Sequence, residues 1–143
     1  MAKKKKESYR FKSFEGSFEN GRHLRITMNM MESVAWQELS SYAIHVYLLL
    51  KIKYKGDNAE DLSLTYEEGM QYMSQRRFTQ ALDELIDHGF IRIVKHRQNT
   101  RECNIYGLSD MWQHYLTDKF EVSSRLKKKP GSTGRLGKRN DTS

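Results

Sequence analysis

A dense run of apolar residues predicts one helix that is buried on several sides. Ser40 and Ser41 are residue types that favour helix N-caps, and the helix is expected to run from Tyr42 to about Tyr54. Gly56 can end it, because glycine readily adopts the conformations that follow helices. Apolar side chains cover most of its circumference, namely those of Ala43, Ile44, Val46, Tyr47, Leu48, Leu49 and Leu50.

A short helix with its own start signal is predicted further along the chain. Thr65 and Glu68 have capping-box spacing, in which each side chain accepts a hydrogen bond from the backbone amide of the other residue. The helix should run from Tyr66 to about Tyr72. We expect it to bury three side chains, those of Tyr66, Met70 and Met73.

The next predicted helix is amphipathic. Ser74 can cap a helix from Gln75 to His88, and Gly89 can end it. At 100° per residue the apolar residues gather in one arc that comprises Phe78, Ala81, Leu82 and Leu85, with Ile86 at its edge. The opposite side carries hydrogen-bonding groups in place of the usual Glu/Lys mixture, namely Arg76, Thr79, Gln80 and Asp83.

Short strands are expected around this helix. Leu62–Leu64 alternates as a strand does, and Phe90–Val94 alternates apolar residues with Arg92. Cys103–Leu108 is predicted to return beside it, with Cys103 and Ile105 on the inner face. The segment that joins the two strands, Lys95–Arg101, is entirely polar.

The ends of this pattern are expected to hold further local elements. Met30–Leu39 is predicted as a short helix or turn that buries Met31, Val34 and Trp36. Asn20-Gly21 could turn a hairpin between short strands around Phe18 and Leu24.

Ser109 can cap a last helix, which holds several aromatic and apolar residues. These side chains could pack on their own domain; they are those of Met111, Trp112, Tyr115, Leu116 and Phe120. Within residues 110–121 they could instead form the seam of a homodimer, an arrangement common among regulators that bind paired half-sites.

Charge divides the 143 residues into three parts, although the whole chain carries a net +7. Residues 1–25 hold eight Lys/Arg and three Glu, a net +5, and form a basic and aromatic arm. Residues 26–121 hold ten Lys/Arg and fourteen Asp/Glu, a net −4. Residues 122–143 hold seven Lys/Arg and one Asp, a net +6, with too few apolar residues to fold, so we expect a disordered basic tail.

The order of elements resembles the winged helix-turn-helix family over roughly Leu39–Leu108. The most specific part is Leu62–Val94, in which Ser74–Phe78 is similar to the turn into a recognition helix. Gly89-Phe90-Ile91 is similar to the exit from that helix into the wing. The resemblance implies an α+β fold, a mainly helical winged helix-turn-helix domain with a small antiparallel sheet. The layout is also similar to regulators and replication initiators of bacterial mobile elements.

The resemblance implies a protein that binds double-stranded DNA through helix 75–88 in the major groove and a basic wing at 95–101. An Arg side chain can pair with guanine and a Gln side chain with adenine, and each good pair discriminates against the wrong base by roughly 1–3 kcal/mol. Arg77 lies toward the flank of the helix and suits a phosphate better than a base. The amides at the starts of the two helices can face anions. The candidate DNA-binding residues are Thr65, Tyr66, Ser74, Gln75, Arg76, Arg77, Thr79, Gln80, Lys95, His96, Arg97, Gln98, Asn99 and Arg101.

Two other functions fit the same pattern. A winged-helix module could bind a protein partner, with the basic ends only adding solubility, or the ends could bind nucleic acid without sequence preference. The polar helix face could also be ordinary solvated surface. Asp83 and Glu84 on or near that face would repel phosphate.

The sequence offers little support for catalysis. The five histidines, with Cys103, lack metal-ligand spacing, and no local catalytic set stands out. His88 is expected to serve as a helix cap and His45 as a satisfied core residue. We therefore expect a protein that is not an enzyme and needs no cofactor, metal or small-molecule substrate.

The compartment is expected to be the cytoplasm. A single cysteine excludes an internal disulfide, and no apolar stretch follows the N-terminal lysines. The longest apolar run, Tyr42–Leu50, is interrupted by His45 and is too short to span a bilayer. No membrane contact is expected.

Overall fold

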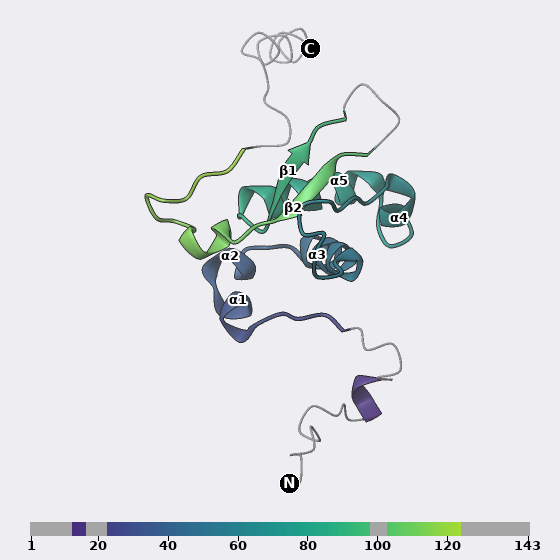
Figure 1. Cartoon of the computed structure of the whole chain (residues 1–143), viewed down its shortest axis with the longest axis horizontal. Helices are drawn as coiled ribbons and strands as arrows, with labels where there is room; N and C mark the ends of the chain where they lie inside the picture. The colour runs from purple at the N-terminus through teal and green to yellow at the C-terminus, as the bar shows by residue number, and fades with distance from the viewer. Residues whose placement is uncertain (1–12, 17–22, 98–102, 124–143) are drawn as a thin grey trace, which may run out of the picture.

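The structure is a computed structural model that describes residues 13–16, 23–97 and 103–123 (Figure 1). It combines helices with a small antiparallel sheet, as the α+β prediction requires. The elements in chain order are η2 (Ser13–Glu15), α1 (Met28–Glu32), α2 (Val34–Gln37), α3 (Ser41–Lys53), α4 (Tyr66–Met70), α5 (Gln75–Asp87), β1 (Ile91–Lys95), β2 (Ile105–Leu108) and η3 (Met111–His114).

The predicted caps set the starts of the main helices. The Ser40 hydroxyl accepts from the Ala43 amide at the start of α3, and the Thr65–Glu68 capping box is complete at the start of α4. At the other end of α5, Gly89 has a φ of 83°, which glycine adopts without strain. The Phe90 amide then donates to the Leu85 carbonyl, so α5 ends as predicted.

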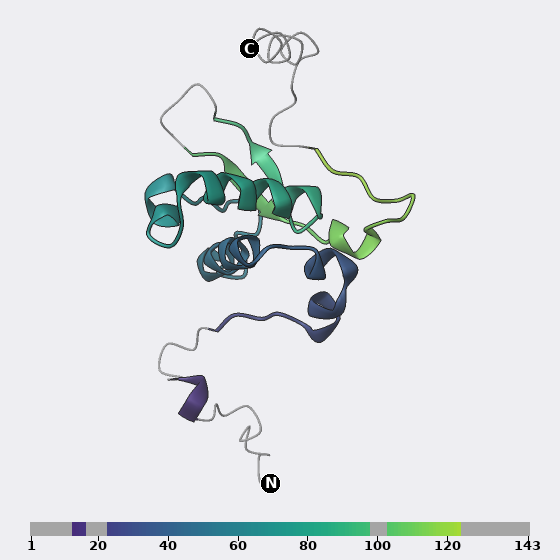
Figure 2. The same ribbon diagram turned by 180° about the vertical axis from the view of Figure 1, so that it is seen from behind.

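The core lies where α3 crosses α5 and the sheet packs against α5. Figure 2 shows α5 in front of both strands and above α3. The two helices contribute fully buried side chains, among them Val46, Leu50, Phe78 and Leu85. Ile86, expected at the edge of the apolar arc, is also fully buried.

An aromatic group closes the core at the end of α5. Phe90 lies 5.6 Å from Trp36 and 5.8 Å from Tyr47, measured between ring centroids, and it stacks on Trp112 at 5.9 Å. Burial raises the pKa of Tyr47 to about 12, so this phenol stays neutral inside the core. The group joins α2, α3 and η3 to the segment that leads into β1.

The sheet is smaller than the sequence predicts. β1 and β2 pair antiparallel, with Ile91 opposite Leu108 and a bulge between Ile93 and Lys95. The expected strand at Leu62–Leu64 is reduced to a bridge in which Leu62 and Tyr106 exchange two backbone hydrogen bonds. Cys103 precedes β2 and is partly exposed, so its predicted place on the inner face of a strand is wrong.

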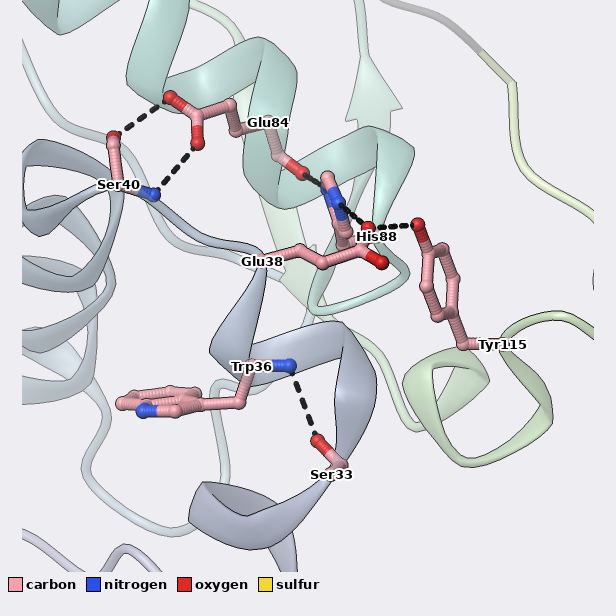
Figure 3. Close-up of polar contacts among 7 residues, drawn as sticks. All are labelled: Ser33, Trp36, Glu38, Ser40, Glu84, His88 and Tyr115. Atoms are coloured by element: carbon pink, nitrogen blue, oxygen red, sulfur yellow. Dashed lines mark hydrogen bonds and ion pairs between the residues drawn. The ribbon is translucent and has the colours of Figure 1, made fainter.

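The segment before α3 is two short helices, not the predicted single one. The Ser33 hydroxyl donates to the Met30 carbonyl, which ends α1, and accepts from the Trp36 amide, which starts α2 (Figure 3). The turn directs Trp36 into the core, as predicted. It leaves Met31 and Val34 exposed, so their predicted burial is wrong.

The face that α4 buries also differs from the prediction. A Cβ placed on Gly69 would lie 2.4 Å from the Phe78 ring, so α4 approaches α5 through this glycine. Tyr66 and Met70 lie on either side of the contact and stay half-exposed, whereas Met73 is buried as predicted. The helix also ends at Met70, short of Tyr72.

The chain after β2 forms a short 3-10 helix and not the predicted longer helix. Trp112 is buried, and its amide donates to the Gly89 carbonyl. Leu116 then adopts a left-handed φ of 67° and is exposed, which ends the helical path. Trp112, Tyr115 and Phe120 pack on their own domain, the alternative to a dimer seam.

Predictions for the two ends can be compared with the structure only in part. Leu24 lies in a segment, residues 23–27, without regular secondary structure, so a strand around Leu24 is wrong. The hairpin turn at Asn20-Gly21 and residues 124–143 of the tail lie outside the described residues.

Candidate nucleic-acid interface

The first turns of α5 present an exposed polar face. Ser74 caps the helix by accepting from the Arg77 amide at 3.2 Å. Gln75, Arg76 and Gln80 are exposed, whereas the apolar side chains of the same helix, such as Phe78 and Leu82, are buried. These three side chains can therefore reach a ligand that approaches the helix.

Thr79 is less available than its neighbours on α5. It is half-buried, and its hydroxyl donates to the Gln75 carbonyl at 2.9 Å. The oxygen retains lone pairs, so it can still accept a hydrogen bond. Thr79 could therefore meet a donor, but its own donor is already used within the helix.

Arg77 lies on the α3 side of α5. It is exposed, and its guanidinium carbon lies 5.0 Å from the centre of the Tyr42 ring, within the range of a cation–π contact. The position agrees with the predicted place of Arg77 on the flank of the helix. The contact holds the cation at the edge of the exposed face.

The acidic residues of α5 lie away from the cations at its start. Glu84 accepts from the Ser40 amide at 2.9 Å and from the Ser40 hydroxyl at 2.7 Å, so it faces α3 (Figure 3). Partial burial, and then the charge of Asp83, raise the pKa of Asp87 in the last turn. The helix is therefore polarised, with Arg76 and Arg77 at one end and carboxylates toward the other.

The start of α4 offers less to an anion than its sequence suggests. Thr65 and Tyr66 are exposed, but the Thr65 amide donates to the Glu68 carboxylate and the Glu68 amide donates to the Thr65 hydroxyl. Lys53 pairs with the same carboxylate at 2.6 Å. Two of the amides at this end are therefore already bonded, and a negative charge lies beside them.

The candidate wing is described at its two ends only. Lys95 and His96 are exposed, whereas Arg97 is half-buried and its amide donates to the Asn104 side chain at 2.7 Å. Gln98, Asn99 and Arg101 lie outside the described residues. In Figure 1 and Figure 2, β1 ends and β2 begins toward the α4 end of α5, so Lys95, the last residue of β1, lies on the side of the sheet nearer the start of that helix.

The structure adds three aromatic side chains that sequence reasoning did not assign to the site. Tyr42 lies under Arg77, and the rings of His45 and Tyr72 are 4.7 Å apart. His45 is only partly buried, so its predicted place as a core residue is wrong. The available signal was the spacing of Tyr42 and His45, since residues three apart share a helix face.

A separate polar cluster forms hydrogen bonds around the last turn of α5. Glu38 accepts from the Tyr115 hydroxyl at 2.5 Å and lies 3.2 Å from His88 Nε2, while His88 Nδ1 lies 2.8 Å from the Glu84 carbonyl (Figure 3). The hydrogen bond from Tyr115 lowers the pKa of Glu38. His88 is the C-cap of α5, as predicted. The cluster ties α2 and the segment after β2 to the end of this helix.

Searches for other chemistry and for relatives were negative. Across the described residues, no three His, Cys, Asp or Glu side chains come together as a metal site, and no helix has the length and apolarity needed to cross a bilayer. Comparison with protein-family models, curated proteins and solved structures found no significant match to this chain.

Proposed function

We propose that residues 26–121 form a winged helix-turn-helix domain that binds double-stranded DNA and acts as a transcription regulator or replication initiator. In this proposal α5 is the recognition helix, the β1–β2 hairpin is the wing, and the protein acts by binding and not by catalysis. The observation that carries it is the exposed start of α5, with Gln75, Arg76 and Gln80 facing outward while the other side is buried in the core.

The arrangement around α5 supports the same proposal. The chain passes through α3, the Leu62 bridge, α4, α5 and the hairpin, and Leu62 pairs with β2 in the manner of a short third strand. This order agrees with the resemblance noted in the sequence. Lys95 at the end of β1 and His96 after it are exposed, so in this proposal they contact phosphates while the helix reads bases.

The polarity of α5 suggests how the helix would enter the groove. A major groove about 12 Å wide admits one helix, and side chains near its start reach the base edges. Arg76 can make two hydrogen bonds to guanine and Gln80 two to adenine. The carboxylates of Asp83 and Asp87 would meet phosphates if the helix entered along its whole length, so we infer entry by its first turns.

The test is selection of bound duplexes from a random library, followed by affinity measurements at one stated salt concentration. The double variant Arg76→Ala, Gln80→Ala should lose sequence discrimination by roughly tenfold or more, because two base contacts are removed. The matched control is Gln37→Ala, Gln113→Ala, which removes two exposed side chains from α2 and η3. Discrimination that survives in the Arg76, Gln80 variant, or a wild-type protein that binds no duplex, would overturn the proposal.

A further inference from the structure

Four side chains from three segments of the chain meet beside the start of α5. Tyr42 and His45 come from α3, Tyr72 from the turn after α4, and Arg77 from the first turns of α5. Arg77 lies over the Tyr42 ring at 5.0 Å, and the His45 and Tyr72 rings are 4.7 Å apart. We call these four residues the flank cluster.

The two pairs of the flank cluster lie along one side of α3 and together form a strip. Tyr42 and His45 are three residues apart on α3, so the two pairs lie about one helical turn from each other. Tyr72 is 54% exposed and Tyr42 is 38% exposed. Since Arg77 follows Gln75 and Arg76 directly, the strip adjoins the exposed face of α5.

The chemistry of the strip favours an anionic ligand. The Arg77 guanidinium lies over one face of the Tyr42 ring, and the His45 ring contacts the Tyr72 ring at an angle of 57°, so each tyrosine has less free ring surface for stacking on a base. Within the described part of the chain, the hydroxyls of Tyr42 and Tyr72 make no hydrogen bond, so both can donate. Phenol, guanidinium and imidazole groups are all donors to phosphate oxygens.

We propose that the flank cluster binds the phosphodiester backbone of the DNA strand that runs along the α3 side of the groove entered by α5. The inference rests on the proposed DNA-binding function and extends it from Arg77 on α5 to side chains of α3 and of the turn after α4. A helix in a groove lies between two phosphate backbones, and the wing lies on the sheet side of α5. The cation–π contact with Tyr42 holds Arg77 in place before binding, which lowers the entropy lost on contact.

The experiment compares the wild type with Arg77→Gln and with the double variant Tyr42→Phe, Tyr72→Phe. Binding is measured over a range of salt to one selected duplex, one unrelated duplex and one single-stranded oligonucleotide. Phenylalanine keeps the rings and removes only the hydroxyls. Lys119→Gln, which removes an exposed charge far along the chain, is the matched control. Circular dichroism and urea unfolding check that each variant folds.

Each variant of the flank cluster should weaken both duplexes equally. Each hydrogen bond to phosphate that a variant loses should lower its affinity for DNA about two- to tenfold. Arg77→Gln should also reduce the salt slope by about 0.9, the value for one phosphate contact, whereas the tyrosine variant should leave the slope unchanged. Lys119→Gln should change neither quantity.

Three outcomes would overturn the inference. If the flank variants behave like Lys119→Gln while Arg76→Ala, Gln80→Ala still loses discrimination, the flank cluster is not a contact and the proposed function stands. If Arg77→Gln changes the preference between the two duplexes, Arg77 reads bases and not phosphate. If the tyrosine variant weakens only single-stranded oligonucleotides, the rings serve as a stacking platform. Failure of the wild type to bind any duplex would instead reject the proposed function.

Discussion

At Gly69 the absence of a side chain lets α4 lie directly against the ring of Phe78. We predict that Gly69→Ala destabilises the domain, because the added methyl group would meet that fully buried ring at 2.4 Å. Overpacking costs about 1–3 kcal/mol, which exceeds the roughly 1 kcal/mol that alanine gains over glycine in a helix. Urea unfolding should show a lower midpoint for the variant.

The cause can be separated with a second substitution. In a Phe78→Leu background the ring is gone, so adding Gly69→Ala should cost little or even stabilise the helix. An equal loss of unfolding free energy in both backgrounds would show that the Phe78 ring is not the obstacle.

Glu68 should contribute to the pH dependence of stability. Hydrogen bonds from Lys53 and from the Thr65 amide lower the pKa of Glu68 from its usual 4.5. A lowered pKa in the folded state means that the carboxylate stabilises the fold above about pH 4.5, and that this contribution is lost as the pH falls through the lowered value. Glutamine at this position still completes a capping box.

We therefore predict that Glu68→Gln lowers the unfolding free energy at pH 7 and that the difference from wild type closes as the pH falls below 4.5 and through the lowered pKa of Glu68. The effect should be at most about 1 kcal/mol, since Glu68 and Lys53 are partly exposed and solvent screens them. Glu67→Gln, an exposed neighbour on α4, is the control. A difference that stays constant with pH would contradict the assignment.

At the scale of elements, α3 and α5 are joined by more than their apolar faces. The Glu84 carboxylate on α5 holds both the amide and the hydroxyl of Ser40, the N-cap of α3. We predict that Glu84→Gln destabilises the domain by about 1–2 kcal/mol, because it replaces a charged acceptor of two hydrogen bonds with a neutral group. Chemical unfolding at neutral pH measures the loss.

Asp87→Asn is the matched control for Glu84→Gln. Asp87 is largely exposed in the last turn of the same helix. Partial burial and then the charge of Asp83 disfavour its negative charge, which also opposes the helix dipole. Its neutralisation should leave stability unchanged or raise it slightly. Equal losses in the two variants would indicate a general effect of charge on α5 and not the bond to Ser40.

At the scale of the whole molecule, charge distinguishes residues 26–121 from the two ends of the chain. Residues 26–121 carry a net −4, and residues 122–143 carry a net +6. We predict that the tail supplies much of the non-specific affinity for DNA, so that deletion of residues 122–143 flattens the salt dependence. If about six phosphates are neutralised in the full-length chain, log K should fall with log salt with a slope of about −5.

A tail of the same length with its seven Lys/Arg replaced by glutamine should behave as the deletion does, because the loss is one of charge. Non-specific duplexes titrated over a range of salt give both slopes. An unchanged slope would exclude the tail from binding, and it would leave contacts by α5 and the wing to account for the affinity.

The sequence by itself determined the elements whose signals are local. The caps at Ser40 and Ser74, the Thr65–Glu68 box and the Gly89 ending each involve residues within a few positions, so spacing alone predicts them. The same holds for the apolar arc of α5, since helical periodicity places those side chains together. These signals also identified the exposed residues at the start of α5.

Only the tertiary structure decided what depends on contacts between distant segments. Glu84 and Ser40 are 44 residues apart, and Glu38 and Tyr115 are 77 apart, so no local pattern relates them. The packing of Gly69 on Phe78 determines which face of α4 is buried. After β2 the chain forms a short 3-10 helix that buries Trp112, where the sequence predicted a longer helix. Local spacing determines how a segment folds, whereas the side chains of other segments determine which of its faces is covered.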